Sequence, residues 1–159
     1  MLHLGPVDGL RLVRADHWHI TLRFLGEVAE ELVPTIADSL RSATAALGTT
    51  RCDLGPTTAW FSGHRVLQIP ARGLDRVAAA VRAATVPIVP ETSESEIRFT
   101  GHMTIARARR QSIDRAARMS LAGIPVDSTF SVDALDLVKS ELASEGPDYT
   151  TLARIPLQR

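Results

Sequence analysis

The stretches "HITLRFLG" (residues 19–26) and "HMTIARAR" (102–109) carry a histidine and then a threonine in the same register. Each stretch heads a similar series of predicted elements: a motif strand, a helix and two further strands. The first series ends in "VLQIP" (66–70) and the second in "LARIPL" (152–157), each about fifty residues beyond its histidine. A repeat of this kind indicates an internal duplication packed as two pseudo-symmetric lobes.

The two motifs share one side-chain geometry. In a strand, residues two apart point to the same face, so His19 lies beside Thr21 and His102 lies beside Thr104. The intervening aliphatic residues then face the other way, into a core. If the two strands meet at a central groove between the lobes, two imidazoles and two hydroxyls surround one ligand.

This set of side chains suits a phosphate ester. Imidazole has an unperturbed pKa of about 6.5, so a pair of histidines can serve as general base and general acid in one turnover. Threonine hydroxyls can donate hydrogen bonds to non-bridging phosphate oxygens. In-line attack at phosphorus needs a base on one side and an acid on the other, and the duplicated motif supplies both.

The two motifs allow two competing interpretations. A metal site is disfavoured because each motif offers a single His, its neighbour is Thr, and no Asp, Glu or Cys falls inside either motif. The simpler alternative is ordinary strand sequence, and one copy alone would favour it. Two copies in matching contexts favour function.

Composition limits the class of protein. The chain has 159 residues, enough for one domain, and its 45% hydrophobic and 23% charged residues are typical of soluble globular proteins. A formal net charge of zero means that any anion site must be local. Cys52 is the only cysteine, so an internal disulfide is excluded. Because no membrane segment or signal peptide is recognisable, we expect a cytoplasmic protein that does not associate with membranes.

Hydrophobic periodicity and turn signals predict an α+β fold with antiparallel sheets and outer helices. Helices are expected within about 31–47, at about 74–84, and from an N-cap at Ser112 to near Gly123. Strands are expected at about 18–25, 52–54, 57–61, 65–69, 97–108, 129–138 and 149–156, with a turn at 145–148. One bilobal domain is predicted over 1–159, with the first motif in about 10–70 and the second in about 85–157.

The chain resembles the two-histidine phosphoesterase superfamily and, within it, the RNA 2',3'-cyclic phosphodiesterase family, also called 2'-5' RNA ligases. "WHITLRFLGEV" (18–28) is similar to the first family motif and "IRFTGHMTIARARR" (97–110) to the second. "FSVDALDLVKSELASEGPDYTTLARIPL" (130–157) resembles the closing hairpin. The resemblance covers about residues 10–157.

The resemblance implies a role for each motif residue. His19 and His102 would be the catalytic pair, and Thr21 and Thr104 would bind the phosphate. In the family mechanism His102 would activate water, or a 5'-hydroxyl in reverse ligation, while His19 protonates the leaving 3'-oxygen. Hydrolysis would then leave a 2'-phosphate. The resemblance also implies that the family's N-terminal strand and helix are absent here, because only about ten residues precede Arg11.

Four further residues are predicted to bind substrate. Arg107 lies where the family favours Arg, but it is an odd number of residues from His102 and faces away in a regular strand, unless a bulge re-aims it. Arg23 falls on the face of His19, where a surface or ion-paired role is an equal alternative. Phe61 and Arg65 flank a turn where base stacking or a phosphate contact is possible, although ordinary turn and core roles are favoured.

The leading hypothesis is therefore a metal-independent RNA 2',3'-cyclic phosphodiesterase that needs no cofactor. One alternative keeps the mechanism but takes small cyclic nucleotides or 2'-5' oligonucleotides as substrate. Another, from a different class, is a catalytically weak RNA-binding relative. The sequence contains no Gly-rich nucleotide loop, so an ATP-dependent mechanism finds no support. It says nothing about the oligomeric state.

Overall fold

The computed structural model describes residues 8–61, 65–90, 99–108, 113–143 and 146–157. The chain forms two compact units, and each is assembled from three separate stretches. Unit 1 comprises Met1–Thr21, Cys52–Arg72 and Thr100–Phe130, and unit 2 comprises Leu22–Arg51, Gly73–Phe99 and Ser131–Arg159. The predicted α+β class with antiparallel sheets is confirmed. The units do not follow the repeats, since both His-X-Thr motifs fall in unit 1. The single bilobal domain stays a prediction.

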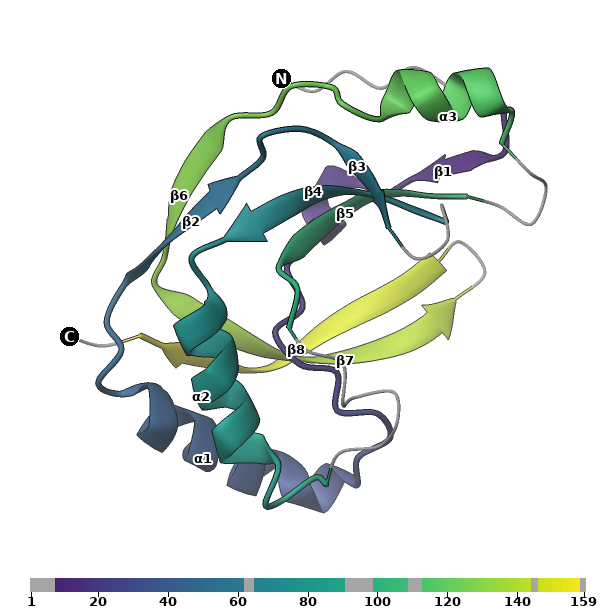
Figure 1. Ribbon diagram of the computed structural model, residues 1–159. Coiled ribbons are helices and arrows are strands. Elements are labelled where there is room, and N and C mark those ends of the chain that lie inside the picture. The colour runs from purple at the N-terminus through teal and green to yellow at the C-terminus, as the bar shows by residue number, and fades with distance from the viewer. Residues whose placement is uncertain (1–7, 62–64, 91–98, 109–112, 144–145, 158–159) are drawn as a thin grey trace. The chain divides into compact units, whose positions relative to one another are not determined.

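An antiparallel sheet makes up most of unit 1 (Figure 1), although residues 50–51 and 131–132 of its strands belong to unit 2. The strand order is β1-β5-β4-β2-β6, and β3 also pairs with β4. The strands are β1 (Leu10–Leu12), β2 (Thr50–Leu54), β3 (Ala59–Phe61), β4 (Val66–Arg72), β5 (His102–Ala108) and β6 (Ser128–Val132). β5 therefore lies between β1 and β4, so the strand that carries the second motif is central.

One face of this sheet is apolar, and helix α3 (Arg115–Leu121) is linked to this face through Trp60. Its buried residues come from β4 and β5: Leu67, Ile69, Met103, Ile105 and Ala106. Trp60 shares this face because its register partner is Leu67, and its indole N–H donates to the Arg118 carbonyl at 2.9 Å. The burial of Met103 and Ile105 confirms the core-facing side predicted for the second motif.

A short ladder joins the connection between β2 and β3 to the segment that follows α3. Thr58 N–H donates to the Ile124 carbonyl at 2.9 Å, and Val126 N–H donates to the Pro56 carbonyl at 2.8 Å. Gly55, next to this ladder, has a φ of +123°. A Cβ at Gly55 would lie 2.1 Å from the Val126 carbonyl oxygen, so only glycine fits there without displacing backbone.

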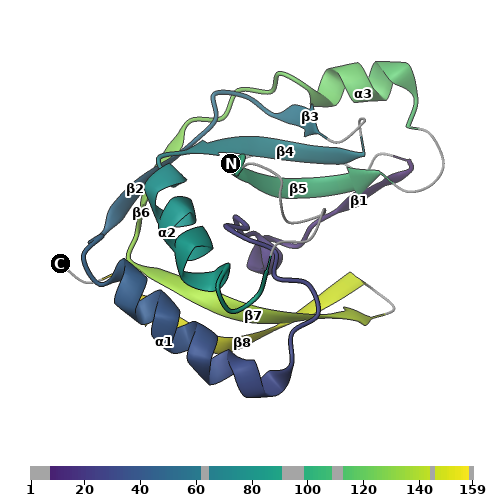
Figure 2. The same cartoon turned by 60° about the horizontal axis from the view of Figure 1, so that its bottom comes forward.

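Unit 2 packs two helices against a two-stranded hairpin (Figure 2). Helix α1 (Val33–Thr44) follows a 3-10 turn, η2 (Glu30–Leu32), and lies beside α2 (Asp75–Thr85). The hairpin is β7 (Ala134–Ala143) with β8 (Gly146–Pro156). The core consists of Ile36, Leu40, Val77, Val81, Ala84, Leu135, Ile155 and Leu157. The three- and four-residue spacing of the helical members explains why α1 and α2 were predictable from the sequence.

The first motif does not form the strand expected at 18–25; only Ile20 makes an isolated bridge, to Met103. After Leu12 the chain leaves the sheet through a 3-10 turn, η1 (Ala15–His17), before returning at Ile20. Because β5 begins at His102, no strand remains to pair with residues beyond Thr21. The strand expected at 97–108 is correspondingly shorter, and residues 97 and 98 lie outside the described part.

The ends of the last elements also differ from the expectation. The predicted closing strands are three rather than two, and Pro147 pairs with Leu142 in the hairpin instead of forming the turn. A two-stranded sheet leaves each strand an open edge, where a Pro without an N–H is tolerated. Helix α3 begins at Arg115 after Asp114, and the predicted N-cap Ser112 lies outside the described residues.

Candidate active site

The bridge between Ile20 and Met103 brings the two motifs together within unit 1. In an antiparallel pair the neighbours of a bridge oppose each other, so His19 lies across from Thr104 and Thr21 lies across from His102. His102 and Thr104 of β5 lie on the face opposite to Met103, since side chains alternate along a strand. The bridge brings the backbone of the first motif beside them, and the joint action of the four residues stays a prediction.

The rings of both histidines are oriented by the same type of contact, from Nδ1 to a backbone carbonyl two residues earlier. His19 Nδ1 lies 2.8 Å from the His17 carbonyl oxygen, and His102 Nδ1 lies 2.8 Å from the Thr100 carbonyl oxygen. A carbonyl only accepts hydrogen bonds, so Nδ1 carries the proton and donates it in both rings. Nε2 then offers a lone pair in the neutral ring and an N–H in the imidazolium. Each histidine is thus oriented to accept or donate a proton through Nε2.

These orienting carbonyls were not found by sequence reasoning, which considered only side chains. His17 and Thr100 have unlike side chains, yet their main chains perform the same task two residues before each histidine. The signal available in the sequence was the shared spacing from the motif. A carbonyl two residues upstream can meet Nδ1 only when the backbone adopts this geometry, which residue type does not reveal.

A β-bulge in β5 decides where Arg107 points. Thr104 pairs with Gln68, but Ala106 pairs with Leu67, which leaves Ile105 as an extra residue. Ile105 and Ala106 are consecutive and both buried, 2% and 0% exposed. Alternation therefore restarts after the bulge, and Arg107 opposes Val66, which shares the face of Gln68 and Thr104. The exposed Arg107 lies on the face of the two motifs.

The bulge also brings a second arginine to that face. Arg11 of β1 is the register partner of Arg107, so the two side chains start directly opposite each other. Arg11 could not be recognised from the sequence as a site residue, because its distance from the first motif gives no indication of a shared face. Paired positive charges on one face favour an anionic ligand there.

Phe61 approaches the second histidine directly. The rings of Phe61 and His102 stack with centroids 5.1 Å apart and an interplanar angle of 28°. Phe61 is 38% exposed, so part of its ring remains open. Arg65 precedes β4, its carbonyl accepts from Ala108 N–H at 2.8 Å, and its side chain is exposed at the far end of β5 from His102.

Arg23 is placed differently from the expectation. It belongs to unit 2, where its guanidinium donates to the Thr85 hydroxyl and, at 2.7 Å, to the Val89 carbonyl. Thr85 is the last residue of α2 and is fully buried. These contacts join the residues that follow Thr21 to the end of α2, and the substrate-binding role of Arg23 stays a prediction.

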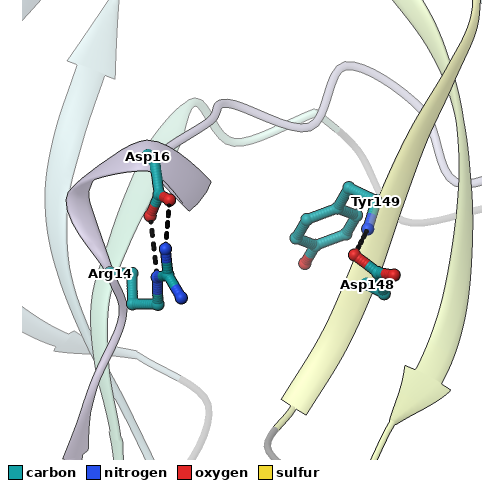
Figure 3. A network of polar contacts seen from close by, with 4 residues as sticks. All are labelled: Arg14, Asp16, Asp148 and Tyr149. Atoms are coloured by element: carbon teal, nitrogen blue, oxygen red, sulfur yellow. Dashed lines mark hydrogen bonds and ion pairs between the residues drawn. The ribbon is translucent and has the colours of Figure 1, made fainter.

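The turn that delivers His19 carries its own ion pair (Figure 3). Arg14 donates to both carboxylate oxygens of Asp16, with Nε to Oδ1 at 3.1 Å and one terminal nitrogen to Oδ2 at 2.6 Å. The Arg14 guanidinium holds the pKa of Asp16 below its ordinary value. Trp18 Nε1 donates to the Val13 carbonyl at 3.1 Å, closing the loop on the other side. Together these contacts hold the chain between β1 and the first motif.

Two further observations concern metal binding and membrane-spanning helices. Among the described residues, no group of three or more His, Cys, Asp or Glu side chains is arranged to hold a metal ion. Across the same residues, no helix is long and apolar enough to span a bilayer.

Comparison with known proteins gives the quartet a context. Residues 5–58, which include the first motif, match the family described as LigT-like phosphoesterases. This match confirms the predicted resemblance to the two-histidine phosphoesterases at the level of LigT-like phosphoesterases, while the RNA 2',3'-cyclic phosphodiesterase family stays a prediction. The fold is similar to TT0787 of Thermus thermophilus, with a TM-score of 0.78 and 26% identity over 95% of this chain and 84% of that one.

Two structures of E. coli LigT are also similar to the chain. The complex with phosphate has a TM-score of 0.61 and 25% identity, covering 94% of this chain and 80% of that one. The complex with 3'-AMP has a TM-score of 0.64 and 24% identity, covering 97% and 84%. The LigT-like match supports a phosphoesterase type of activity.

Proposed function

We propose that the protein is a metal-independent RNA 2',3'-cyclic phosphodiesterase that produces 2'-phosphate ends and can also join 2',3'-cyclic phosphate ends to 5'-hydroxyl ends. The observation that carries the proposal is the matched pair of imidazoles. Both donate through Nδ1 to a carbonyl, both present Nε2, and each opposes the other motif's threonine. Such a pair can supply both proton transfers of an in-line displacement.

In the proposed reaction, Nε2 of neutral His102 takes a proton from water as the water oxygen bonds to phosphorus. The bond between phosphorus and the 3'-oxygen breaks, and that oxygen takes a proton from Nε2 of the His19 imidazolium. The product is a 2'-phosphate with a free 3'-hydroxyl. The hydroxyls of Thr21 and Thr104 donate to the non-bridging oxygens, whose charge grows in the transition state.

The surrounding residues suit a nucleotide end. Arg107 lies on the same face and can add a guanidinium to the phosphate, or to the next one along the RNA. The open part of the Phe61 ring offers a stacking surface for a base. That LigT structures contain 3'-AMP and phosphate supports a nucleotide-borne phosphate as the ligand.

The test uses a short RNA with a terminal 2',3'-cyclic phosphate, with EDTA present and with 2'- and 3'-phosphate products separated. We expect the wild type to form the 2'-phosphate, and His19→Ala or His102→Ala to lower kcat by roughly 10²- to 10⁴-fold. His17→Ala is the matched control, because it keeps the carbonyl that orients His19 and should stay within about threefold of wild type. Full activity in either motif variant, or complete loss of wild-type activity in EDTA, would contradict the proposal.

A further inference from the structure

Gln68 is a buried polar residue whose side chain the motif chemistry does not explain. It lies in β4, is 7% exposed, and its Oε1 has no hydrogen-bond partner in the part of the chain that the structure describes. An unpaired buried carbonyl costs free energy, and in a folded protein each such atom calls for an explanation. A ligand that supplies a donor would provide one.

The register places Gln68 on the floor of the candidate site. It pairs with Thr104 on β5 and with Ala59 on β3, and the adjoining pair on the same face is Pro70 with His102. A directly opposed residue has its Cβ about 5 Å away, and a diagonal one lies within reach of a long side chain. Gln68 is therefore beside the threonine of the second motif and close to its histidine.

The neighbours of Gln68 leave its carbonyl for the substrate. The side chains of Ala59 and Pro70 carry no donor, and the one hydroxyl hydrogen of Thr104 is directed to the phosphate in the proposed reaction. The cyclic phosphate anion carries no hydrogen to donate. The attacking water does, because it has two O–H bonds and His102 takes only one of its protons.

We propose that the Gln68 carbonyl accepts a hydrogen bond from the attacking water and so makes the site favour hydrolysis over transfer to an alcohol. This inference rests on the proposed function. The water oxygen bonds to phosphorus, and one water proton passes to Nε2 of His102. The other hydrogen stays on the former water oxygen and donates a hydrogen bond to the side-chain carbonyl of Gln68. The bond to the 3'-oxygen breaks and that oxygen takes its proton from His19. A 5'-hydroxyl has a single O–H, which His102 needs, so it leaves the Gln68 carbonyl unpaired.

The test measures the partition of one substrate between two nucleophiles. The RNA with a 2',3'-cyclic phosphate is turned over in a mixture of water and methanol, and the methyl phosphodiester is separated from the 2'-phosphate. In Gln68→Met, which keeps the length of the side chain but removes the acceptor, we expect methanolysis relative to hydrolysis to rise about tenfold. Gln68→Glu keeps an acceptor oxygen and should keep the wild-type ratio.

The ratio of methanolysis to hydrolysis is independent of the fraction of enzyme that is folded, so a partly unfolded variant still gives a valid ratio. If Gln68→Met gives poor yields, Gln68→Leu serves as the second variant with the same expectation. Loss of an unpaired acceptor should also leave the melting temperature unchanged or raised, whereas loss of a structural hydrogen bond would lower it. An unchanged ratio in an active Met or Leu variant would overturn this inference and leave the proposed function intact. Inactive wild type would overturn both.

Discussion

Replacing Gly55 by alanine should destabilise unit 1 severely. The new Cβ would lie 2.1 Å from the Val126 carbonyl oxygen, at a φ of +123°. That carbonyl cannot move freely, because Val126 N–H donates to the Pro56 carbonyl at 2.8 Å in the ladder beside the turn. Relief of the clash must therefore break part of the ladder.

The expected cost follows from two contributions. Backbone strain at a disfavoured φ costs about 1–3 kcal/mol, and a buried hydrogen bond left unmade costs about 1–3 kcal/mol. The free energy of unfolding should fall by roughly 2–6 kcal/mol, and at about 2–4 °C per kcal/mol for a chain of this size Tm should fall by on the order of 10 °C. Thermal and urea unfolding monitored by circular dichroism would measure both quantities.

Gly26→Ala is the matched control. Gly26 also has a positive φ, +74°, but nothing lies within 4 Å of its added Cβ. Gly26→Ala should lower the free energy of unfolding only by the strain of an alanine in the left-handed region, about 1 kcal/mol. Equal losses for Gly55→Ala and Gly26→Ala would refute the reasoning, because the clash with Val126 would then contribute nothing.

Three further outcomes can be measured. Arg107→Gln should raise KM for the cyclic-phosphate RNA about tenfold or more and weaken its salt dependence, whereas Arg107 facing away would leave both unchanged. Arg23→Met should lower the free energy of unfolding, measured in urea, by about 1.5–3 kcal/mol while kcat at low temperature stays unchanged. If Arg23 acted in the active site instead, kcat would fall and the free energy of unfolding would stay unchanged. Burial raises the pKa of the Cys52 thiol, so the folded protein should react slowly with thiol reagents at neutral pH. The free energy of unfolding should decline as pH rises above the thiol pKa of the unfolded chain, about 8.5. Rapid labelling of the folded protein would contradict this.

The motif residues were predictable because their chemistry is carried by residue type and spacing. His19, Thr21, His102 and Thr104 could be selected by period-two alternation and repetition, and the resemblance gave them proposed roles. Helices α1 and α2 were equally accessible, since buried positions such as Ile36 and Leu40 recur at helical spacing. What these cases share is that a local pattern is sufficient.

Other features depend on pairing between distant segments, which one sequence does not record. The bulge at Ile105 exists because β5 pairs with β4 in a shifted register, and only then does Arg107 reach the motif face. Gln68 resembles an ordinary strand residue until its partner is known to be Thr104. Arg23 had the right alternation from His19, but the chain stops pairing after Thr21, so alternation no longer applied.

The assembly of unit 1 from segments that are distant in sequence has a consequence for how the protein folds during synthesis. Leu10 pairs with Ala108, so the first strand must wait for a partner synthesised almost a hundred residues later. Contacts of this kind slow folding, because a long loop closes before the contact rewards it. During translation, His19 and Ile20 therefore leave the ribosome well before Met103, the residue that Ile20 bridges, has been added to the chain.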